Sequence, residues 1–276
     1  MMKSSPFVVY QPKSLPEAVQ LSAKHGEEAK IIAGGQTLVP MLAMRIATPA
    51  ILIDINEVQE LQSIVENDTL IEVGAAVSQA RLEDYLSSTK AHPLLACMMP
   101  WIAHRPIRNR GTVGGSIAHA DPSAELVLAL SVLKGWVILA NSHKQRKVSA
   151  EEFFLGALQT DRQMDEILVK VVFPKLDKNA QFGFVEYGYR HGDFAVVSVA
   201  MMKINQEWTF AYGGINDTPQ VFTQRLANYE DALAYVAHLA NTVDVREDPT
   251  ASSDLRRHLM QSQSELLIQQ IESGKE

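Results

Sequence analysis

The chain has 276 residues, of which 46% are hydrophobic and 21% charged, and its formal net charge is −7. This balance is typical of a globular protein with a real core and argues against a basic surface that binds nucleic acid or membranes. No stretch reaches the roughly 18 apolar residues of a membrane-spanning helix, and the amino terminus lacks a signal peptide's apolar core, so a cytoplasmic location without a transmembrane segment is expected.

Strands and helices alternate from the start of the chain. Ser14 begins a predicted helix, with Glu17 as its capping-box partner and Gly26 at its end. The apolar runs at 30–33 and 51–55 predict two strands, of which the second is apolar enough to be buried on both faces. These patterns indicate an α/β arrangement.

The same alternation continues through the middle of the chain, where turn residues and helix caps mark the boundaries. The first predicted elements are a hairpin over 61–75 that turns at Glu66-Asn67-Asp68, a helix over 79–86 capped by Ser78, and a buried helix over 93–104 broken by Pro100. A helix over 123–134 follows, capped by Asp121, with Pro122 in its first turn and Gly135 at its end. A strand over 136–140, a short helix from Ser149 and a strand over 166–174 complete this part.

The composition changes after Pro174. The polar segment 176–181 is a predicted linker. Three stretches rich in aromatic and β-branched residues follow and predict a three-stranded antiparallel sheet with a turn near Asn205-Gln206. Two helices, over 229–243 and from about residue 253, end the chain. We therefore expect an α+β protein with subdomains at 1–56 and 57–176 and a carboxyl-terminal domain at 177–276.

Motifs for most common kinds of catalysis are missing. The sequence has no HExxH, no Cys/His ligand spacing, no GxSxG and no P-loop, so neither a protein-bound metal nor a catalytic residue is predicted. The absence of GxGxxG makes an ordinary Rossmann site improbable. Cys97 is the single cysteine, which rules out a cysteine-ligated iron–sulfur cluster within this chain, and it is interpreted as a buried core thiol.

Two glycine pairs raise the question of a cofactor. "AGGQTL" contains Gly34-Gly35 and "GTVGGSIAHA" contains Gly114-Gly115, each followed by small hydroxyl residues. Glycine-containing turns can present consecutive backbone N–H groups to a diphosphate without any cationic side chain. Two such loops that converge would form a pyrophosphate cradle. The alternative is that each pair is an ordinary tight turn.

Three motifs together resemble a known family. "IIAGGQTLVPMLAMRIATPAILIDIN", "IRNRGTVGGSIAHADPSAEL" and "RHGDFAVVSVAM" occur in the order found in the FAD-binding medium subunits of molybdenum hydroxylases, which include carbon monoxide dehydrogenase, nicotine dehydrogenase and the central domain of xanthine dehydrogenase. The resemblance covers essentially the whole chain. It implies a two-subdomain FAD-binding domain of the PCMH or vanillyl-alcohol-oxidase-like type, followed by the carboxyl-terminal domain.

The resemblance also implies roles for single residues. The first loop would wrap the FAD pyrophosphate with Ile32, Ala33, Gly34, Gly35, Gln36, Thr37 and Leu38, and the second loop would contribute Thr112, Val113, Gly114, Gly115 and Ser116. Asp121 and Glu125 match positions of polar contacts to the ribityl or adenosine part, and Arg190 and Asp193 belong to a motif near the flavin ring, together with His191 and Gly192.

Several of these residues have structural alternatives. Asp121 could simply cap a helix, and Glu125 could be an acid favoured in a first helical turn. Tyr189 or Phe194 could stack on the flavin or belong to the core. The segment 94–104 could face a partner subunit or form a core helix. Some relatives carry lysine where this chain has Glu186, so no cationic flavin partner is assigned there.

The function implied by the resemblance is electron transfer. A large molybdopterin subunit would oxidise the substrate, a small subunit with two [2Fe–2S] clusters would carry the electrons, and this chain's FAD would pass them to an external acceptor, in a dimer of heterotrimers. Two alternatives stay open: a stand-alone flavin-dependent reductase such as UDP-N-acetylenolpyruvoylglucosamine reductase, and a scaffold subunit that has lost its flavin.

Overall fold

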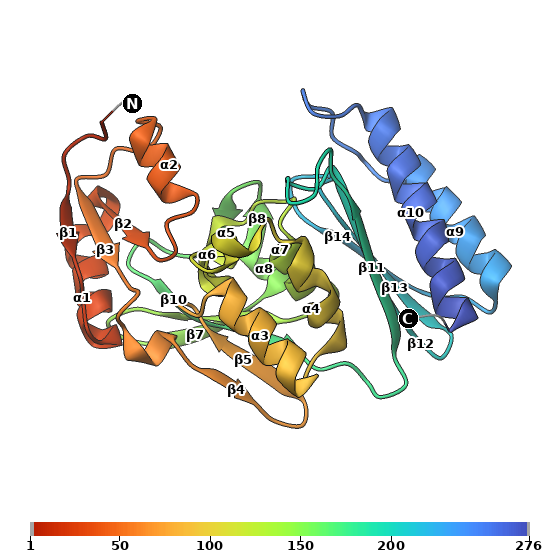
Figure 1. Cartoon of the computed structure of the whole chain (residues 1–276), viewed down its shortest axis with the longest axis horizontal. Coiled ribbons are helices and arrows are strands. Elements are labelled where there is room, and N and C mark those ends of the chain that lie inside the picture. Colours follow the sequence, from red (N-terminus) through yellow and green to blue (C-terminus); the bar gives the residue numbers. More distant parts are fainter. Residues whose placement is uncertain (1–2, 275–276) are drawn as a thin grey trace.

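The computed structural model describes residues 3–274 and places three large β-sheets one after another along the longest axis (Figure 1). A fourth sheet within these residues has only two short strands, Phe154–Gly156 and Gln159–Thr160. The amino-terminal sheet is parallel, with the strand order β1-β3-β2. Its elements are β1 (Val8–Tyr10), α1 (Leu15–His25), η1 (Gly26–Glu28), β2 (Ala29–Ile32), α2 (Leu38–Ala43) and β3 (Ile51–Asp54). The apolar residues of β3 are buried because this strand is central, as its sequence predicts.

The middle sheet has five antiparallel strands in the order β4-β5-β10-β6-β7. Five α-helices and one 3-10 helix lie between β5 and β6 in the chain. The elements are η2 (Gln59–Leu61), β4 (Ile64–Glu66), β5 (Leu70–Gly74), α3 (Gln79–Thr89), α4 (Pro93–Met98), η3 (Met99–Trp101), α5 (Arg105–Arg108), α6 (Val113–His119), α7 (Glu125–Val132), β6 (Trp136–Ala140), β7 (Gln145–Ser149), α8 (Ala150–Phe153), β8 (Phe154–Gly156), β9 (Gln159–Thr160) and β10 (Ile167–Pro174).

The third sheet is antiparallel and has four strands in chain order. Its elements are β11 (Gln181–Tyr187), β12 (Val197–Ile204), β13 (Glu207–Gly213) and β14 (Gln220–Arg225), followed by α9 (Tyr229–Thr242) and α10 (Ser253–Ser273). The two terminal helices cover its outer face, and α4 and α7 contact it from the middle of the molecule (Figure 1). The prediction of three strands was therefore wrong, because the edge strand β14 has no buried residue and its second half is polar and exposed.

Buried apolar side chains connect the three sheets. Ala140, Ile167 and Val169 of the middle sheet belong to the core of the first sheet. Ala200 and Ala211 of the third sheet belong to the core of the middle one. The chain thus has the expected α+β architecture, whereas the domain boundaries near 56 and 176 stay predictions. Within the described residues, no helix is long and apolar enough to cross a bilayer.

Most of the predicted elements are confirmed, including the hairpin with its turn after Glu66, the helix capped by Ser78 and the turn at Asn205. One cap differs. The Ser14 hydroxyl accepts from the Glu17 amide, but the Glu17 carboxylate bonds to the amide of Lys13 instead of closing a capping box. The complete capping box lies at the start of α8.

The segment 94–104 is largely core. Leu94, Leu95, Met98 and Met99 are buried in the middle core, which confirms the core interpretation of this helix. Cys97 is different: it is exposed on α4, and its thiol donates to the Leu94 carbonyl oxygen at 3.0 Å. The interpretation of Cys97 as a buried thiol was wrong because the residue falls on the outer side of a helix that is otherwise buried.

His92 should make the protein sensitive to acid. Burial is the largest cause that lowers the pKa of His92 below its ordinary 6.5. At the start of α4, Nδ1 of the ring accepts a hydrogen bond from the Leu95 amide, and Nε2 lies 3.0 Å from the Pro174 carbonyl oxygen. Because the folded chain disfavours the protonated ring, this contribution to stability is complete above pH 6.5 and is lost as the pH falls through the lowered pKa.

We therefore expect the free energy of unfolding to fall more steeply below pH 6.5 in the wild type than in His92→Asn. Asparagine is a good helix cap that does not titrate in this range, so the variant should differ from the wild type by about 1 kcal/mol or less at pH 8. Denaturant melts at a series of pH values measure this slope. Parallel curves would contradict the prediction.

Candidate functional site

The first glycine loop follows β2 at the carboxyl edge of the parallel sheet, where ligands of such sheets commonly bind. Its carbonyl groups are bonded inside the protein. The Ala33 oxygen accepts from Asn56 Nδ2 at 2.8 Å, the Gly34 oxygen from Gln36 Nε2 at 3.0 Å, and the Gly35 oxygen from the Val39 amide at 3.0 Å. The carbonyls therefore do not face the space in front of the loop.

The amides of the same loop remain free. In the part of the chain that the structure describes, the backbone N–H groups of Gly34, Gly35, Gln36 and Thr37 have no hydrogen-bond partner. Gly35 has φ +72°, a conformation that favours glycine. Four consecutive free donors in a turn whose carbonyls are occupied form a nest for an anion. This is the arrangement predicted for the first glycine pair.

The second glycine pair is built differently. Gly114 and Gly115 lie in the first turn of α6, and their amides donate to the Ala75 oxygen at 3.1 Å and to Thr112 Oγ1 at 3.0 Å. The amides of Val113 and Ser116 are also bonded within the protein. The expectation of a second set of free N–H donors was therefore wrong. Gly114 instead permits close packing, since a Cβ on it would lie 2.5 Å from Cα of Ala75.

The two glycine segments do converge. A Cβ built on Gly34 would lie 2.1 Å from the Arg110 carbonyl oxygen and 2.7 Å from Cα of Gly111, so the backbones touch just before Thr112. A cleft of about 580 Å³ opens at this contact. Its lining combines the first loop, including Ile32 and Ala33, with Val39, Pro40, Asp54, Asn56 and Arg110.

Sequence reasoning missed three polar residues of this cleft. Asp54 ends the central strand β3, Asn56 follows it, and Arg110 precedes the second glycine pair. The signal for the first two was present, because polar residues at the carboxyl end of a buried parallel strand reach the same edge as the neighbouring loop. Arg110 could be placed only by the contact between the two loops.

The acidic residues after α6 lie beside the third sheet. Asp121 Oδ1 accepts from the Ser123 amide at 2.9 Å, and α7 begins only at Glu125 after Ala124, so the alternative that Asp121 caps this helix was wrong. Glu125 is buried, with 7% exposure. The pKa of Glu125 is raised to about 7, mainly by burial and to a smaller extent by the charge of the nearby Asp121, while its own backbone amide and Arg108 act in the opposite direction.

The predicted residues Arg190 and Asp193 lie in the exposed loop between β11 and β12, and neither side chain has a hydrogen bond or ion pair within residues 3–274. Gly192, with φ +85°, packs this loop against His104, because a Cβ there would lie 2.9 Å from the His104 ring. The loop thus contacts the segment just before α5. Tyr189 and Phe194 are 59% and 68% exposed, so their interpretation as core residues was wrong.

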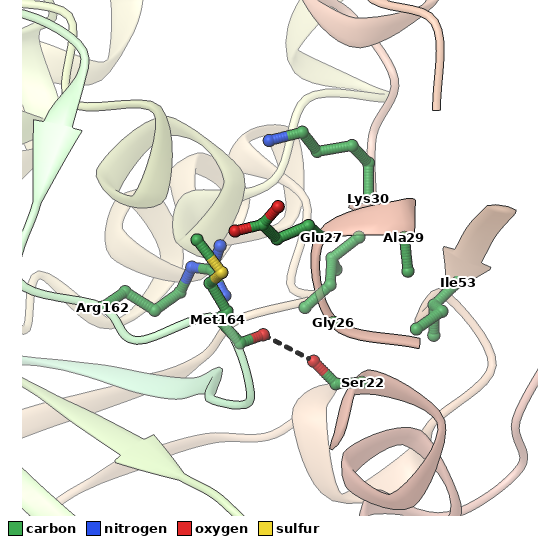
Figure 2. A pocket seen from close by; sticks show the side chains of 9 residues that line it. Ser22, Gly26, Glu27, Ala29, Lys30, Ile53, Arg162 and Met164 are labelled. Atoms are coloured by element: carbon green, nitrogen blue, oxygen red, sulfur yellow. Dashed lines mark hydrogen bonds between the residues drawn. The ribbon is translucent and has the colours of Figure 1, made fainter. Parts of the chain in front are cut away.

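A smaller cavity of about 250 Å³ lies beside the beginning of β2. Figure 2 shows Glu27 and Arg162 pointing toward each other across it, and a hydrogen bond of 3.1 Å from Ser22 Oγ to the Met164 oxygen. This bond ties α1 to the segment before β10. The cavity therefore belongs to the junction between the first and middle sheets, apart from the predicted site residues of the glycine loops.

Residues 4–176 match the family model of the FAD binding domain in molybdopterin dehydrogenase. The chain belongs to this family. FAD is thus its cofactor, and the free amides of the first loop fit a nucleotide that carries a diphosphate.

Relatives extend the similarity beyond that domain. Caffeine dehydrogenase subunit beta from Pseudomonas sp. (strain CBB1) is 33% identical over 272 residues, covering 94% of this chain and 92% of the relative. The carbon monoxide dehydrogenase medium chain of Hydrogenophaga pseudoflava is 34% identical over 199 residues, covering 71% and 68%. Quinoline 2-oxidoreductase from Pseudomonas putida 86 has a similar structure, with a TM-score of 0.92, 31% identity and 99% of both chains covered.

Proposed function

We propose that this chain is the FAD-carrying electron-transfer subunit of a molybdenum-containing hydroxylase or dehydrogenase. Membership of the FAD-binding family, together with the nest of four free amides in the first glycine loop, supports this function. The bound flavin supplies the redox chemistry, because it can accept single electrons and release two to an acceptor. The chain itself binds and orients the cofactor.

The residues would divide that work. The first loop, residues 32–38, holds the pyrophosphate through its amides, and Thr112 and Ser116 contribute hydroxyl groups on the other side of the loop contact. Asp121 and Glu125 make polar contacts to the sugar parts. Arg190 and Asp193, which are exposed and without partners in the described chain, face the flavin end of the cofactor. In this arrangement, FAD lies between subdomains 1–56 and 57–176, with 177–276 as the third unit.

The partners would be a large molybdopterin-binding subunit and a small subunit with [2Fe–2S] clusters, in a cytoplasmic dimer of heterotrimers. Two observations support partners: relatives of this chain are named as subunits or medium chains, and the described chain has no group of cysteine and histidine residues that could hold a metal. Co-purification from the native host tests this. If the isolated chain alone oxidised an organic substrate at the rate of the cell extract, a stand-alone reductase would take its place.

Gly35→Val tests the cofactor site. The branched side chain disfavours φ +72° and meets Cγ2 of Val39, which is already 3.1 Å from the Cβ position. We expect the purified variant to lose at least ten-fold in FAD affinity while it keeps its far-UV circular dichroism. Flavin absorbance per chain measures the occupancy.

The control is Gly26→Ala, at a positive-φ glycine with open space around it and outside both glycine loops, which should retain its flavin despite some loss of stability. Full occupancy in Gly35→Val would mean that the loop is an ordinary turn. A wild-type chain that is colourless after reconstitution with FAD would instead support the alternative of a scaffold subunit.

A further inference from the structure

Helix α7 packs on the third sheet (Figure 1), and three buried polar side chains come from this region. Glu125 comes from the first turn of α7, Glu186 from β11 and Ser198 from β12, with exposures of 7%, 8% and 0%. Acids are rarely buried to this extent unless they are paired. Neither glutamate has an ion-pair partner within the described residues.

Strand register places the group on the inner face of the sheet. Glu186 pairs with Ser198, and Ser198 with Gly213 on the next strand. Ala200, two residues beyond Ser198, belongs to the middle core, so side chains at these positions point toward α7. A Cβ built on Gly213 would lie 2.5 Å from Ser198 Oγ and 3.3 Å from the Pro122 carbonyl oxygen. The sheet therefore packs closely against the segment that leads into α7.

The group contains acceptors that have no donor. Glu186 Oε2 and Ser198 Oγ are buried without a hydrogen-bond partner in the described chain. The charged residues that influence Glu125 are Asp121, which repels its charge, and Arg108, which attracts it. Arg108 is already bonded to both carboxylate oxygens of Glu83, at 2.9 and 3.0 Å, so it does not neutralise the two buried acids.

Protonation relieves the cost of burying these acids. Burial raises the pKa of Glu186 to about 9, and the charge of Glu125 contributes to this increase. Glu125 itself has a pKa near 7 for the reasons given above. At neutral pH the two carboxyl groups therefore retain a proton, which lies mainly on Glu186.

We propose that Glu125 and Glu186 act as one proton-holding pair that takes up a proton from solvent when the FAD bound beside them is reduced. The proposal rests on the proposed function, in which Glu125 contacts the cofactor. The electrons stay on the cofactor, and their negative charge attracts a proton to the nearby carboxylate, where one O–H bond forms. Glu186 acts through Glu125, by holding a proton next to it, and need not touch the cofactor.

The first test uses the flavin-free full chain with carboxyl-¹³C-labelled glutamate. NMR titration should show two glutamates that titrate far above the others. Glu186→Gln should remove the upper transition, and Glu125→Gln should lower it by about one pH unit, because coupled sites shift each other by this amount. The exposed Glu207→Gln is the control and should leave both transitions in place. Ordinary titration of every glutamate, or an unmoved upper transition in Glu125→Gln, would overturn the pair.

The second test measures proton uptake during anaerobic reduction of the FAD-loaded chain by dithionite, with a pH-indicator dye and free FAD as reference. At pH 9, the wild type and Glu207→Gln should take up more protons per FAD than the reference, and Glu186→Gln should lose this excess. At pH 6 the excess should vanish in all three, since the pair is already protonated. Equal uptake by Glu186→Gln and the wild type at pH 9 would refute the redox link.

The two tests separate this proposal from the proposed function. A chain that binds no FAD overturns the redox link together with the electron-transfer role. The NMR titration of the flavin-free chain still decides whether Glu125 and Glu186 share a proton.

Discussion

Replacement of Gly34 by alanine should abolish FAD binding and lower the free energy of unfolding by about 1–3 kcal/mol, the usual cost of overpacking. The new methyl group would lie 2.1 Å from the Arg110 carbonyl oxygen. The Cβ atom is fixed by the backbone of residue 34 and the oxygen belongs to the backbone of residue 110, so no side-chain rotation can relieve the clash. The first loop must then move away from the Arg110–Gly111 backbone, and its amides shift with it.

Gly156→Ala is the matched control, because its nearest neighbour would be Gln159 at 3.7 Å and the residue is distant in sequence from both loops. Flavin absorbance and denaturant melts should leave this control close to the wild type. If Gly34→Ala kept its flavin and its stability, the contact between the two glycine segments would have no part in the site.

The second glycine pair should respond to mutation mainly through stability. In Gly114→Ala the methyl group meets Cα of Ala75 at 2.5 Å in the middle core, and we expect a loss of about 1–3 kcal/mol in the free energy of unfolding. In Gly115→Ala the only close atom is Oγ1 of Thr112 at 2.7 Å, which caps α6 by accepting from the amide of residue 115. Displacement of this cap offsets the gain of about 1 kcal/mol by which alanine favours a helix. This variant should therefore fold almost as stably as the wild type.

Thermal and denaturant melts of the two variants provide the comparison, with flavin content as a second measurement. Gly115 is exposed at the outer side of α6, so a drop in flavin content in Gly115→Ala at unchanged stability would indicate that the cofactor approaches this residue. Equal destabilisation of both variants would contradict the assignment of Gly114 to packing.

Local sequence signals predicted the positions of most elements because they depend on neighbouring residues. Ser78 caps its helix, and the apolar, β-branched and aromatic residues of β12 and β13 mark two strands that are largely buried. The edge strand β14 was missed because an edge strand needs few apolar residues. Cys97 was misjudged because the composition of a helix does not reveal which side faces the core.

The site was predictable only in part, for a related reason. Both glycine pairs carry the same local pattern, yet one leaves its amides free and the other bonds all of them. Part of the difference comes from residues distant in sequence: Asn56 bonds to a carbonyl of the first loop, while Ala75 and Val77 accept two amides of the second loop. Glu186 and Glu125 are 61 residues apart in sequence numbering, and only the packing of α7 on the third sheet brings their charges together.

The bonded carbonyls of the first loop have a consequence for the kinetics of cofactor loading. A loop whose shape is already fixed by Asn56, Gln36 and Val39 gives up little conformational entropy when an anion binds. Insertion of FAD should then require no prior folding of this segment, so its rate should rise linearly with FAD concentration and not level off at a limit set by loop ordering. A newly made chain could in this way acquire its flavin before or after it assembles with other subunits.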